Sequence, residues 1–193
     1  MLGVVLSGGL SSRMGTDKGL MKLEAKTWAQ TALDKLTTLQ LPVVISVNAT
    51  QYETYPAVFP AEQLVKDNEG LDIHGPLAGV LSVHVQYPQE DLLVLACDMP
   101  LMDPVIIEQL IIAYRNNEEE AYVFTNGGEP EPLCAIYTAK ALAATLQRYH
   151  NRELSKHSMK FMLEHLVVHF IPLLPGQEKF FRNFNAHAEL NGL

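Results

Sequence analysis

The sequence predicts an α/β protein built around a mainly parallel central sheet, with helices layered against it. Short apolar runs alternate along the chain with segments of helical spacing, an order typical of folds in which helices connect parallel strands. The clearest run, residues 91–97, is apolar after its first residue, which suits a strand covered on both faces. The length of 193 residues suits a single domain, and neither a repeat nor a linker divides it.

Each strand is predicted from a short apolar run bounded by turn residues, and each helix from apolar residues three or four positions apart. In chain order the predicted strands span residues 2–6, 43–47, 64–65, 91–97, 121–125, 133–137 and 167–171. The predicted helices span residues 28–39, 80–86, 105–114, 139–149 and about 155–165. A tight turn is expected at 75–79 and a further strand at 181–184. Pro104 suits the first turn of its helix, and Pro130 and Pro132 are expected to delimit the strand that follows them.

Composition excludes several classes of function. The chain carries 14 Lys and Arg against 22 Asp and Glu, so its net charge of −8 leaves no extended basic surface for nucleic acid. Cys97 and Cys134 lie in apolar surroundings, which favours buried free thiols in a reducing compartment. No segment approaches the roughly 20 apolar residues of a membrane helix, and the apolar start is too short for a signal peptide. We therefore expect a cytoplasmic protein without nucleic-acid or membrane partners.

The most informative segment is the loop that follows the first strand. Residues 6–18 read L-S-G-G-L-S-S-R-M-G-T-D-K. Gly8 and Gly9 carry no side chains, so backbone N–H groups can approach an anion closely. Arg13 and Lys18 add positive charges that can neutralise phosphates. The glycine spacing matches neither a P-loop nor a dinucleotide-binding fingerprint.

This loop resembles the signature of the NTP-transferase-like nucleotidyltransferases, and more closely that of their molybdenum cofactor guanylyltransferase branch. The resemblance extends over nearly the whole chain, through residues 75–79, 96–100, 130–134 and 183–185. It implies a single-domain, three-layer Rossmann-like fold over residues 1–193. Residues 1–115 would bind the nucleotide, and residues 116–193 mainly the acceptor.

The resemblance also implies a reaction, a cofactor and partners. GMP would pass from GTP to molybdopterin or molybdenum-loaded molybdopterin, forming molybdopterin guanine dinucleotide and pyrophosphate. Mg²⁺ would be the cofactor, and molybdoenzymes or other proteins of cofactor biosynthesis would be the partners. Residues implied to bind the nucleotide are Leu6, Ser7, Gly8, Gly9, Arg13, Gly15, Lys18, Asn48, Asp67 and Asp98. Three of these, Arg13, Lys18 and Asp98, are assigned to catalysis.

Asp98 is also the predicted metal ligand. It follows an apolar strand, at the edge of the sheet where parallel-sheet enzymes bind ligands, and Mg²⁺ prefers carboxylate oxygens. A helix cap is the alternative, but Asp103 fits that cap better. Asp67 and Asn48 also end strands; from the residues alone, a surface turn for Asp67 and a cap for Asn48 are the favoured explanations. The resemblance assigns both to the guanine nucleotide.

The acceptor is assigned to the C-terminal part of the chain. Asn183 and Asn185 alternate on a segment expected to be extended, so both would point the same way, and the resemblance assigns them to molybdopterin. Four basic residues recur every four positions: Arg148, Arg152, Lys156 and Lys160. On one continuous helix they would form a face for the acceptor phosphate, whereas a break at 151–155 would leave them as ordinary solvated charges.

Two alternative functions stay open at this point. One is a related nucleotidyltransferase that uses CTP or another phosphorylated acceptor. The other is a non-catalytic GTP-binding adaptor for molybdoenzymes. The presence of Arg13, Lys18 and Asp98 argues against the adaptor, because a binder without turnover does not need them.

Overall fold

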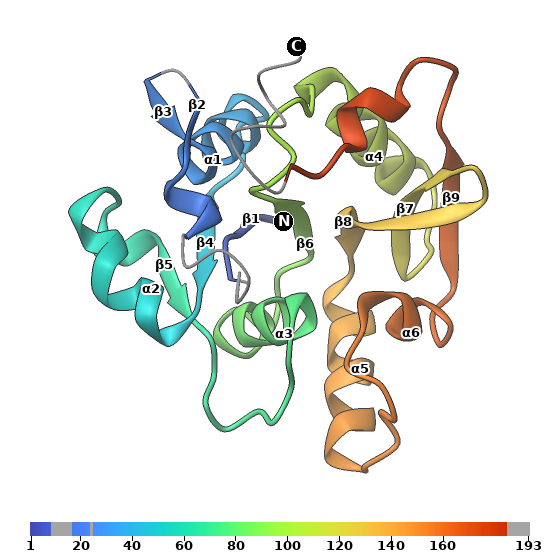
Figure 1. The fold of residues 1–193 in the computed structure, drawn as a ribbon. Helices are drawn as coiled ribbons and strands as arrows, with labels where there is room; N and C mark the ends of the chain where they lie inside the picture. The colour runs from blue at the N-terminus through green and yellow to red at the C-terminus, as the bar shows by residue number, and fades with distance from the viewer. Residues whose placement is uncertain (9–16, 24, 185–193) are drawn as a thin grey trace.

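A seven-stranded sheet forms the centre of the molecule, in a computed structural model that describes residues 1–8, 17–23 and 25–184 (Figure 1). The strand order is β5-β4-β1-β6-β8-β7-β9. The strands are β1 (Leu2–Leu6), β4 (Val43–Val47), β5 (Leu64–Lys66), β6 (Leu92–Ala96), β7 (Ala121–Asn126), β8 (Glu129–Tyr137) and β9 (Val168–Pro172). β8 is antiparallel to β6 and β7, and the remaining neighbours are parallel. The predicted α/β fold with a mainly parallel sheet is confirmed.

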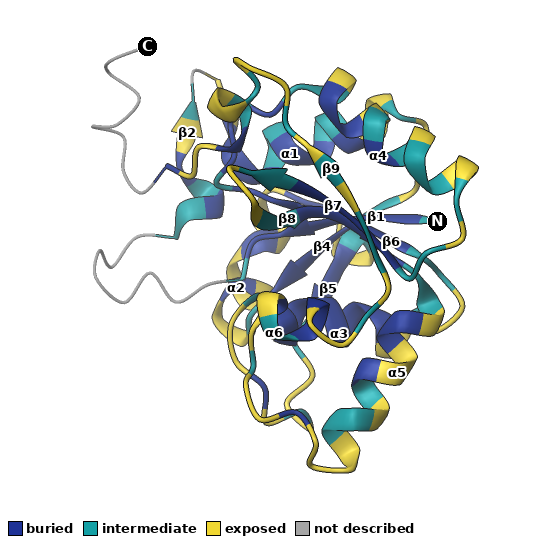
Figure 2. Cartoon of the chain, turned by 90° about the vertical axis from the view of Figure 1, so that its right-hand side faces the viewer, coloured by how far each residue is buried: buried dark blue, intermediate teal, exposed yellow. Residues whose placement is uncertain are grey.

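Helices cover both faces of this sheet (Figure 2). α1 (Trp28–Thr38) and α4 (Pro104–Asn116) pack on one face, while α3 (Pro76–Gln86), α5 (Ala139–His150) and α6 (Met159–Leu163) pack on the other. α2 (Ala49–Thr54) lies beside β4 and β5. Smaller elements are the β2 (Lys22–Leu23) and β3 (Lys26–Thr27) hairpin and the 3-10 turns Lys18–Leu20, Tyr55–Ala57, Ala61–Gln63 and Glu178–Phe181. None of the helices in the described ranges is long and apolar enough to cross a membrane.

The core is divided by the sheet into two layers. Side chains alternate along a strand, so Val4 of β1 packs with α3 while Val5 packs with α1 and α4. Both residues are fully buried, as is most of β6. Because both faces of β6 are buried, residues 92–97 are apolar without interruption. Cys97 and Cys134 are buried free thiols, as predicted, and burial raises the pKa of each to about 12.

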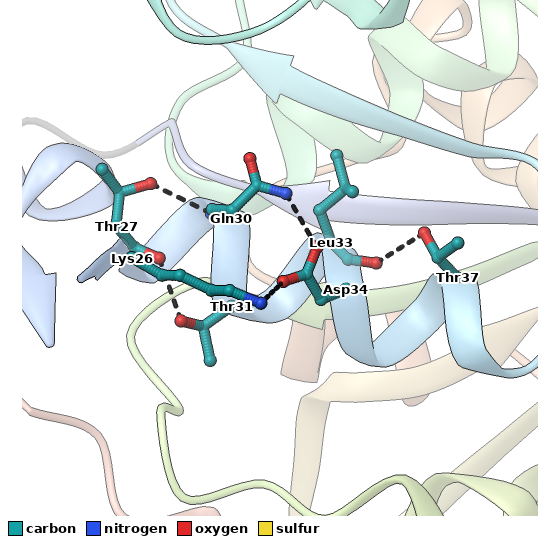
Figure 3. Close-up of polar contacts among 7 residues, drawn as sticks. All are labelled: Lys26, Thr27, Gln30, Thr31, Leu33, Asp34 and Thr37. Atoms are coloured by element: carbon teal, nitrogen blue, oxygen red, sulfur yellow. Dashed lines mark hydrogen bonds and ion pairs between the residues drawn. The ribbon is translucent and has the colours of Figure 1, made fainter. Parts of the chain in front are cut away.

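α1 has a sharply defined start, shown in Figure 3. The Thr27 hydroxyl accepts a hydrogen bond from the Gln30 backbone N–H at 3.1 Å, which satisfies one of the unpaired donors of the first turn. One turn later, the Gln30 amide donates to Asp34 at 2.8 Å, and Lys26 pairs with the same carboxylate at 2.6 Å. These contacts fix the angle at which the chain leaves the β2–β3 hairpin.

α3 differs from its predicted start and approaches the sheet closely. The residues expected to form a turn at 75–79 are the first turn of the helix, with Gly75 as N-cap at φ 70° and Pro76 at the start. Further along, a Cβ added at Gly79 would overlap the Ser46 hydroxyl oxygen and lie 3.2 Å from Leu6 Cδ2. Glycine at this position therefore lets α3 lie directly against the carboxyl ends of β1 and β4.

Pro130 and Pro132 lie within β8, so the prediction that they delimit the strand was wrong. β8 pairs with β6 only through residues 134–137, whereas its first half pairs with β7 alone. A proline costs least where a strand lacks a neighbour on one side, because no ladder hydrogen bond needs its missing N–H. β8 thus extends beyond the carboxyl end of β6.

The C-terminal predictions also need correction. Residues 181–184 are not a strand: the turn Glu178–Phe181 is followed by irregular chain. The helix expected at about 155–165 is shorter, because Ser158 caps α6 by accepting from the Phe161 N–H. The chain is not helical between α5 and α6, so the four basic residues do not lie on one helix. Lys160 instead pairs with Glu129 at 2.7 Å.

Candidate active site

The predicted nucleotide-binding residues of the described chain meet at one edge of the sheet. β5, β4, β1 and β6 are parallel neighbours, so their carboxyl ends coincide. Backbone hydrogen bonds extend the ladder past the strand ends, from Ser7 N to Ser46 O at 3.1 Å, from Asp67 N to Val47 O at 2.9 Å and from Cys97 N to Leu6 O at 3.1 Å. The loops that carry Gly8, Asn48, Asp67 and Asp98 therefore leave the sheet side by side.

Gly8, Asn48 and Asp67 lie together at the end of β1. A Cβ added at Gly8 would lie 3.6 Å from Asp67 Oδ2 and 3.8 Å from the Asn48 backbone nitrogen. Partial burial raises the pKa of the Asp67 carboxyl to about 6, and a hydrogen bond from Ser46 at 3.5 Å opposes the shift. The Asp67 carboxylate is partly desolvated and lies beside Gly8, which has no side chain. This arrangement suits a ligand that supplies hydrogen-bond donors to the carboxylate.

Asn48 is also the N-cap of α2. Its Oδ1 accepts from the Gln51 N–H at 2.9 Å, and Gln51 Oε1 accepts from the Asn48 N–H at 3.0 Å. The two contacts form a capping box, which satisfies two donors of the helix start reciprocally. The cap that the sequence left open is thus present, and it fixes Asn48 beside Gly8.

Leu6 and Ser7 have little surface at this edge. The Leu6 side chain is 6% exposed and packs against α3, and Ser7 is 5% exposed. Their backbone groups are also used, because Leu6 O accepts from Cys97 and Ser7 O accepts from the Gln51 amide at 2.9 Å. Both residues therefore anchor the start of the loop.

Lys18 and Asp98 form an ion pair across the edge. Their side-chain atoms Nζ and Oδ2 are 3.2 Å apart, and the side chains are 26% and 20% exposed. Asp103, and not Asp98, caps α4 by accepting from the Val105 N–H at 2.9 Å, as predicted. Asp98 is thus held by a lysine from the glycine loop instead of by its own helix, which puts one positive and one negative group at the same point.

The carboxylate of Asp98 fits a cation that arrives with substrate. Among residues 1–8, 17–23 and 25–184, no group of three or more His, Cys, Asp or Glu side chains could hold a metal ion. Mg²⁺ keeps several waters and is usually bound by one or two carboxylates together with substrate phosphates. The donor set therefore fits Mg²⁺ on Asp98 with phosphate oxygens better than a resident metal in a protein cage.

Two contacts hold the segment that carries Asp98. The Lys35 ammonium of α1 donates to the Pro100 carbonyl at 2.6 Å, and burial lowers its pKa to about 8. From the C-terminal side, the Phe184 N–H donates to the Asp98 carbonyl at 3.0 Å. Phe184 is 1% exposed and packs with Met21 and Trp28, so its position is firmly set.

The contact of Phe184 brings the predicted acceptor residue Asn183 close to Asp98. Asn183 is exposed and precedes Phe184 directly in the chain. Gly9, Arg13, Gly15 and Asn185 lie outside the described residues. The hydrogen bond from Phe184 thus brings together Asn183 and the predicted metal ligand Asp98, which are 85 positions apart in the sequence.

Sequence reasoning missed a buried polar cluster next to Lys18. Asp17 Oδ1 accepts from the Gly19 N–H at 2.9 Å, the Gln51 amide at 3.0 Å and the Tyr55 hydroxyl at 3.0 Å. In the sequence Asp17 is one residue of the glycine loop without a predicted role, and no strand or helix is predicted within residues 49–62. The capping pattern of Asn48 and Gln51 was the one local signal of this cluster.

The chain is similar in sequence to proteins of one family. Residues 3–168 match the family described as the MobA-like NTP transferase domain. A probable molybdenum cofactor guanylyltransferase of Geobacillus sp. (strain WCH70) is 31% identical over 198 residues, covering 100% of this chain and 97% of that protein. The molybdenum cofactor guanylyltransferase of Shewanella loihica is 26% identical, covering 86% of this chain and 82% of the relative.

Solved structures show the same fold. Molybdopterin-guanine dinucleotide biosynthesis protein A from Archaeoglobus fulgidus superposes with a TM-score of 0.79 at 23% identity, covering 100% of this chain and 96% of that one. A nucleotidyl transferase from Methanothermobacter superposes with a TM-score of 0.73 at 13% identity, covering 99% and 94%. With the family match over residues 3–168 and a full-length relative at 31% identity, the chain belongs to the MobA-like NTP transferase family of nucleotidyltransferases.

Proposed function

We propose that this protein transfers GMP from GTP to the terminal phosphate of molybdopterin, with or without its metal, and releases pyrophosphate. The observation that carries the proposal is the Lys18–Asp98 pair, 3.2 Å apart, at the edge of the sheet where Gly8, Asn48 and Asp67 also meet. Relatives named molybdenum cofactor guanylyltransferases support the choice of substrates.

The proposed reaction is an in-line displacement at the α-phosphorus of GTP. A molybdopterin phosphate oxygen forms the new P–O bond, the bond between the α-phosphorus and the bridging oxygen breaks, and pyrophosphate leaves with that electron pair. Because the nucleophile is already an anion, the reaction needs no strong general base. Catalysis then depends on positioning and on neutralising phosphate charge.

Each residue has a proposed part in this chemistry. Asp98 would hold Mg²⁺, which supplies positive charge at the phosphate oxygens when it is bound. Lys18 would exchange its contact with Asp98 for one with the α-phosphate or the departing pyrophosphate. Arg13 would guide the triphosphate, and the backbone of Gly8, Gly9 and Gly15 would wrap it.

The two substrates would approach from different parts of the chain. Residues 1–115 would bind GTP, with the base near Asn48 and Asp67 and with Leu6 and Ser7 anchoring the loop. Residues 116–193 would mainly bind the acceptor, through Asn183 and Asn185, and the Phe184–Asp98 contact supports this side of the site. We also propose a cytoplasmic enzyme whose product passes to molybdoenzymes.

Binding and turnover together test the proposal. With Mg²⁺ present, GTP is expected to raise the melting temperature more than CTP, ATP or UTP, and pyrophosphate release is expected to require GTP and molybdopterin together. A larger shift with CTP would favour a cytidylyltransferase. Tight GTP binding without pyrophosphate release from a folded protein would favour a non-catalytic adaptor.

Asp67→Asn is expected to stabilise the ligand-free protein at pH 7 and to weaken GTP binding. The pKa of Asp67 is about 6 when folded, above its unfolded value of 3.8, so the folded state binds more protons between these values. Its stability therefore falls as the pH rises through this window, and the cost is fully present at pH 7. Asparagine removes that cost together with a carboxylate able to accept the N–H groups of guanine.

Denaturant titrations and calorimetry check both parts. The free energy of unfolding of Asp67→Asn should exceed that of wild type at pH 7, and the difference should disappear near pH 4. GTP affinity should fall roughly tenfold, or ~1.4 kcal/mol. Unchanged GTP affinity would remove Asp67 from the nucleotide site, whatever its effect on stability.

A further inference from the structure

We propose that Gln51 is a positioning residue for Lys18, acting through Asp17. The inference rests on the proposed role of Lys18 in phosphate transfer, but it concerns a buried side chain that would touch neither substrate. Gln51 lies at the start of α2, 33 positions away from Lys18. Its amide connects three segments that converge on the candidate active site.

Every polar atom of the Gln51 amide is used. Its Oε1 accepts from the Asn48 N–H at 3.0 Å, and its Nε2 donates to Ser7 O at 2.9 Å and to Asp17 Oδ1 at 3.0 Å. The Tyr55 hydroxyl oxygen lies 3.3 Å from Nε2 as a third, longer contact. Gln51 is 5% exposed, so water cannot readily replace these bonds.

Gln51 is connected to Lys18 through the side-chain carboxylate and the backbone of Asp17. Asp17 is the N-cap of the 3-10 turn Lys18–Leu20, and its Oδ1 accepts from Gly19, Gln51 and Tyr55. Lys18 follows Asp17 directly, and its Nζ reaches Asp98 at 3.2 Å. Fixing the carboxylate therefore fixes the backbone from which the Lys18 side chain extends.

The cluster has no spare room. A Cβ added at Gly19 would overlap the Tyr55 hydroxyl oxygen and lie 3.0 Å from Ser7 Oγ. Burial and the nearby Asp17 charge raise the pKa of Tyr55, so its hydroxyl stays protonated and donates to Asp17. Tight packing and fully used hydrogen bonds together indicate a preorganised support for Lys18.

An amide is the group that this position needs. Gln51 must donate to both Ser7 O and Asp17, and a carboxylate can donate to neither. In Gln51→Glu a second carboxylate would face Asp17 at hydrogen-bond distance, and two such groups resist being ionised together. Protonation of the new side chain at lower pH would restore one donor. The pH dependence of this variant therefore reports on the lost hydrogen bonds.

The test compares three variants by pyrophosphate release per folded molecule and by labelling of the Lys18 amine. Gln51→Glu is expected to lower kcat at least tenfold at pH 8, and its kcat relative to wild type should recover as the pH falls to 6. Gln51→Leu has no titratable group, so it should lose kcat without recovery. Gln30→Glu is the matched control, because Gln30 also donates its amide to a carboxylate, Asp34 at 2.8 Å, but that carboxylate lies on α1 (Figure 3) and is not the one that precedes Lys18.

Chemical labelling keeps the inference separate from the proposed reaction. Acylation of Lys18, followed by mass spectrometry, should proceed several times faster in Gln51→Glu and Gln51→Leu than in wild type, and be unchanged in Gln30→Glu. If wild type releases no pyrophosphate, the proposed function fails while the labelling still tests Gln51. Unchanged Lys18 labelling, or a kcat ratio that does not vary with pH in active enzyme, would overturn the inference.

Discussion

Asp98→Asn is expected to abolish most Mg²⁺-dependent turnover while the fold is retained. Asp98 lies two residues beyond β6 and its Oδ2 is 3.2 Å from Lys18 Nζ. The asparagine keeps the shape and one oxygen but removes the charge that would attract the cation. Loss of one electrostatic stabiliser of a charged transition state typically costs roughly 100- to 1,000-fold in kcat, and a similar loss is expected here.

The measurement is pyrophosphate release as a function of Mg²⁺ concentration, with Asp103→Asn as the matched control. The control applies the same aspartate-to-asparagine change five positions later, at Asp103, whose carboxylate caps α4. Asparagine caps a helix about as well as aspartate, so the control should retain turnover and stability. An Asp98→Asn enzyme with an unchanged Mg²⁺ titration would contradict the assignment of Asp98 to the metal.

The edge of the sheet was predictable because strand ends are visible in the sequence. Apolar runs end at Leu6, Val47 and Cys97, and a parallel sheet brings such ends together without any knowledge of individual contacts. That reasoning put Asp98 and Asn48 at one edge, where the structure has them. The sequence also distinguished the role of Asp103 from that of Asp98, because a helix cap is a local pattern and Asp103 directly precedes the predicted start of its helix.

The cluster below the site was not predictable in the same way. The bonds from Gln51 cross 44 positions to Ser7 and 34 to Asp17, and no periodicity links residues so far apart. The prediction that Pro130 and Pro132 delimit β8 was wrong for a related reason. Whether a proline is tolerated in a strand depends on which neighbour the strand lacks, and that is a property of the finished sheet.

Lys18→Met is expected to lower kcat by roughly 100-fold, or ~2.7 kcal/mol of transition-state stabilisation, with little effect on folding. Methionine keeps most of the apolar stem of lysine and removes the charge. In the ligand-free protein the ammonium is balanced by Asp98. If Asp98 binds Mg²⁺ as proposed, the lysine charge would be available to the phosphates, and its loss would be felt mainly in the transition state.

Two comparisons separate Lys18 from Asp98. Lys18→Met should retain its Mg²⁺ dependence, because the carboxylate is still present, whereas Asp98→Asn should lose it. Lys22→Met removes a charge from an exposed position of the neighbouring β2 strand and should leave kcat near wild type. Since both residues of the pair are proposed to act on the same phosphates, the double variant should lose less than the product of the two single losses. Near-normal turnover of Lys18→Met would remove the lysine from the mechanism, and fully multiplicative losses would show that the pair does not act as a unit.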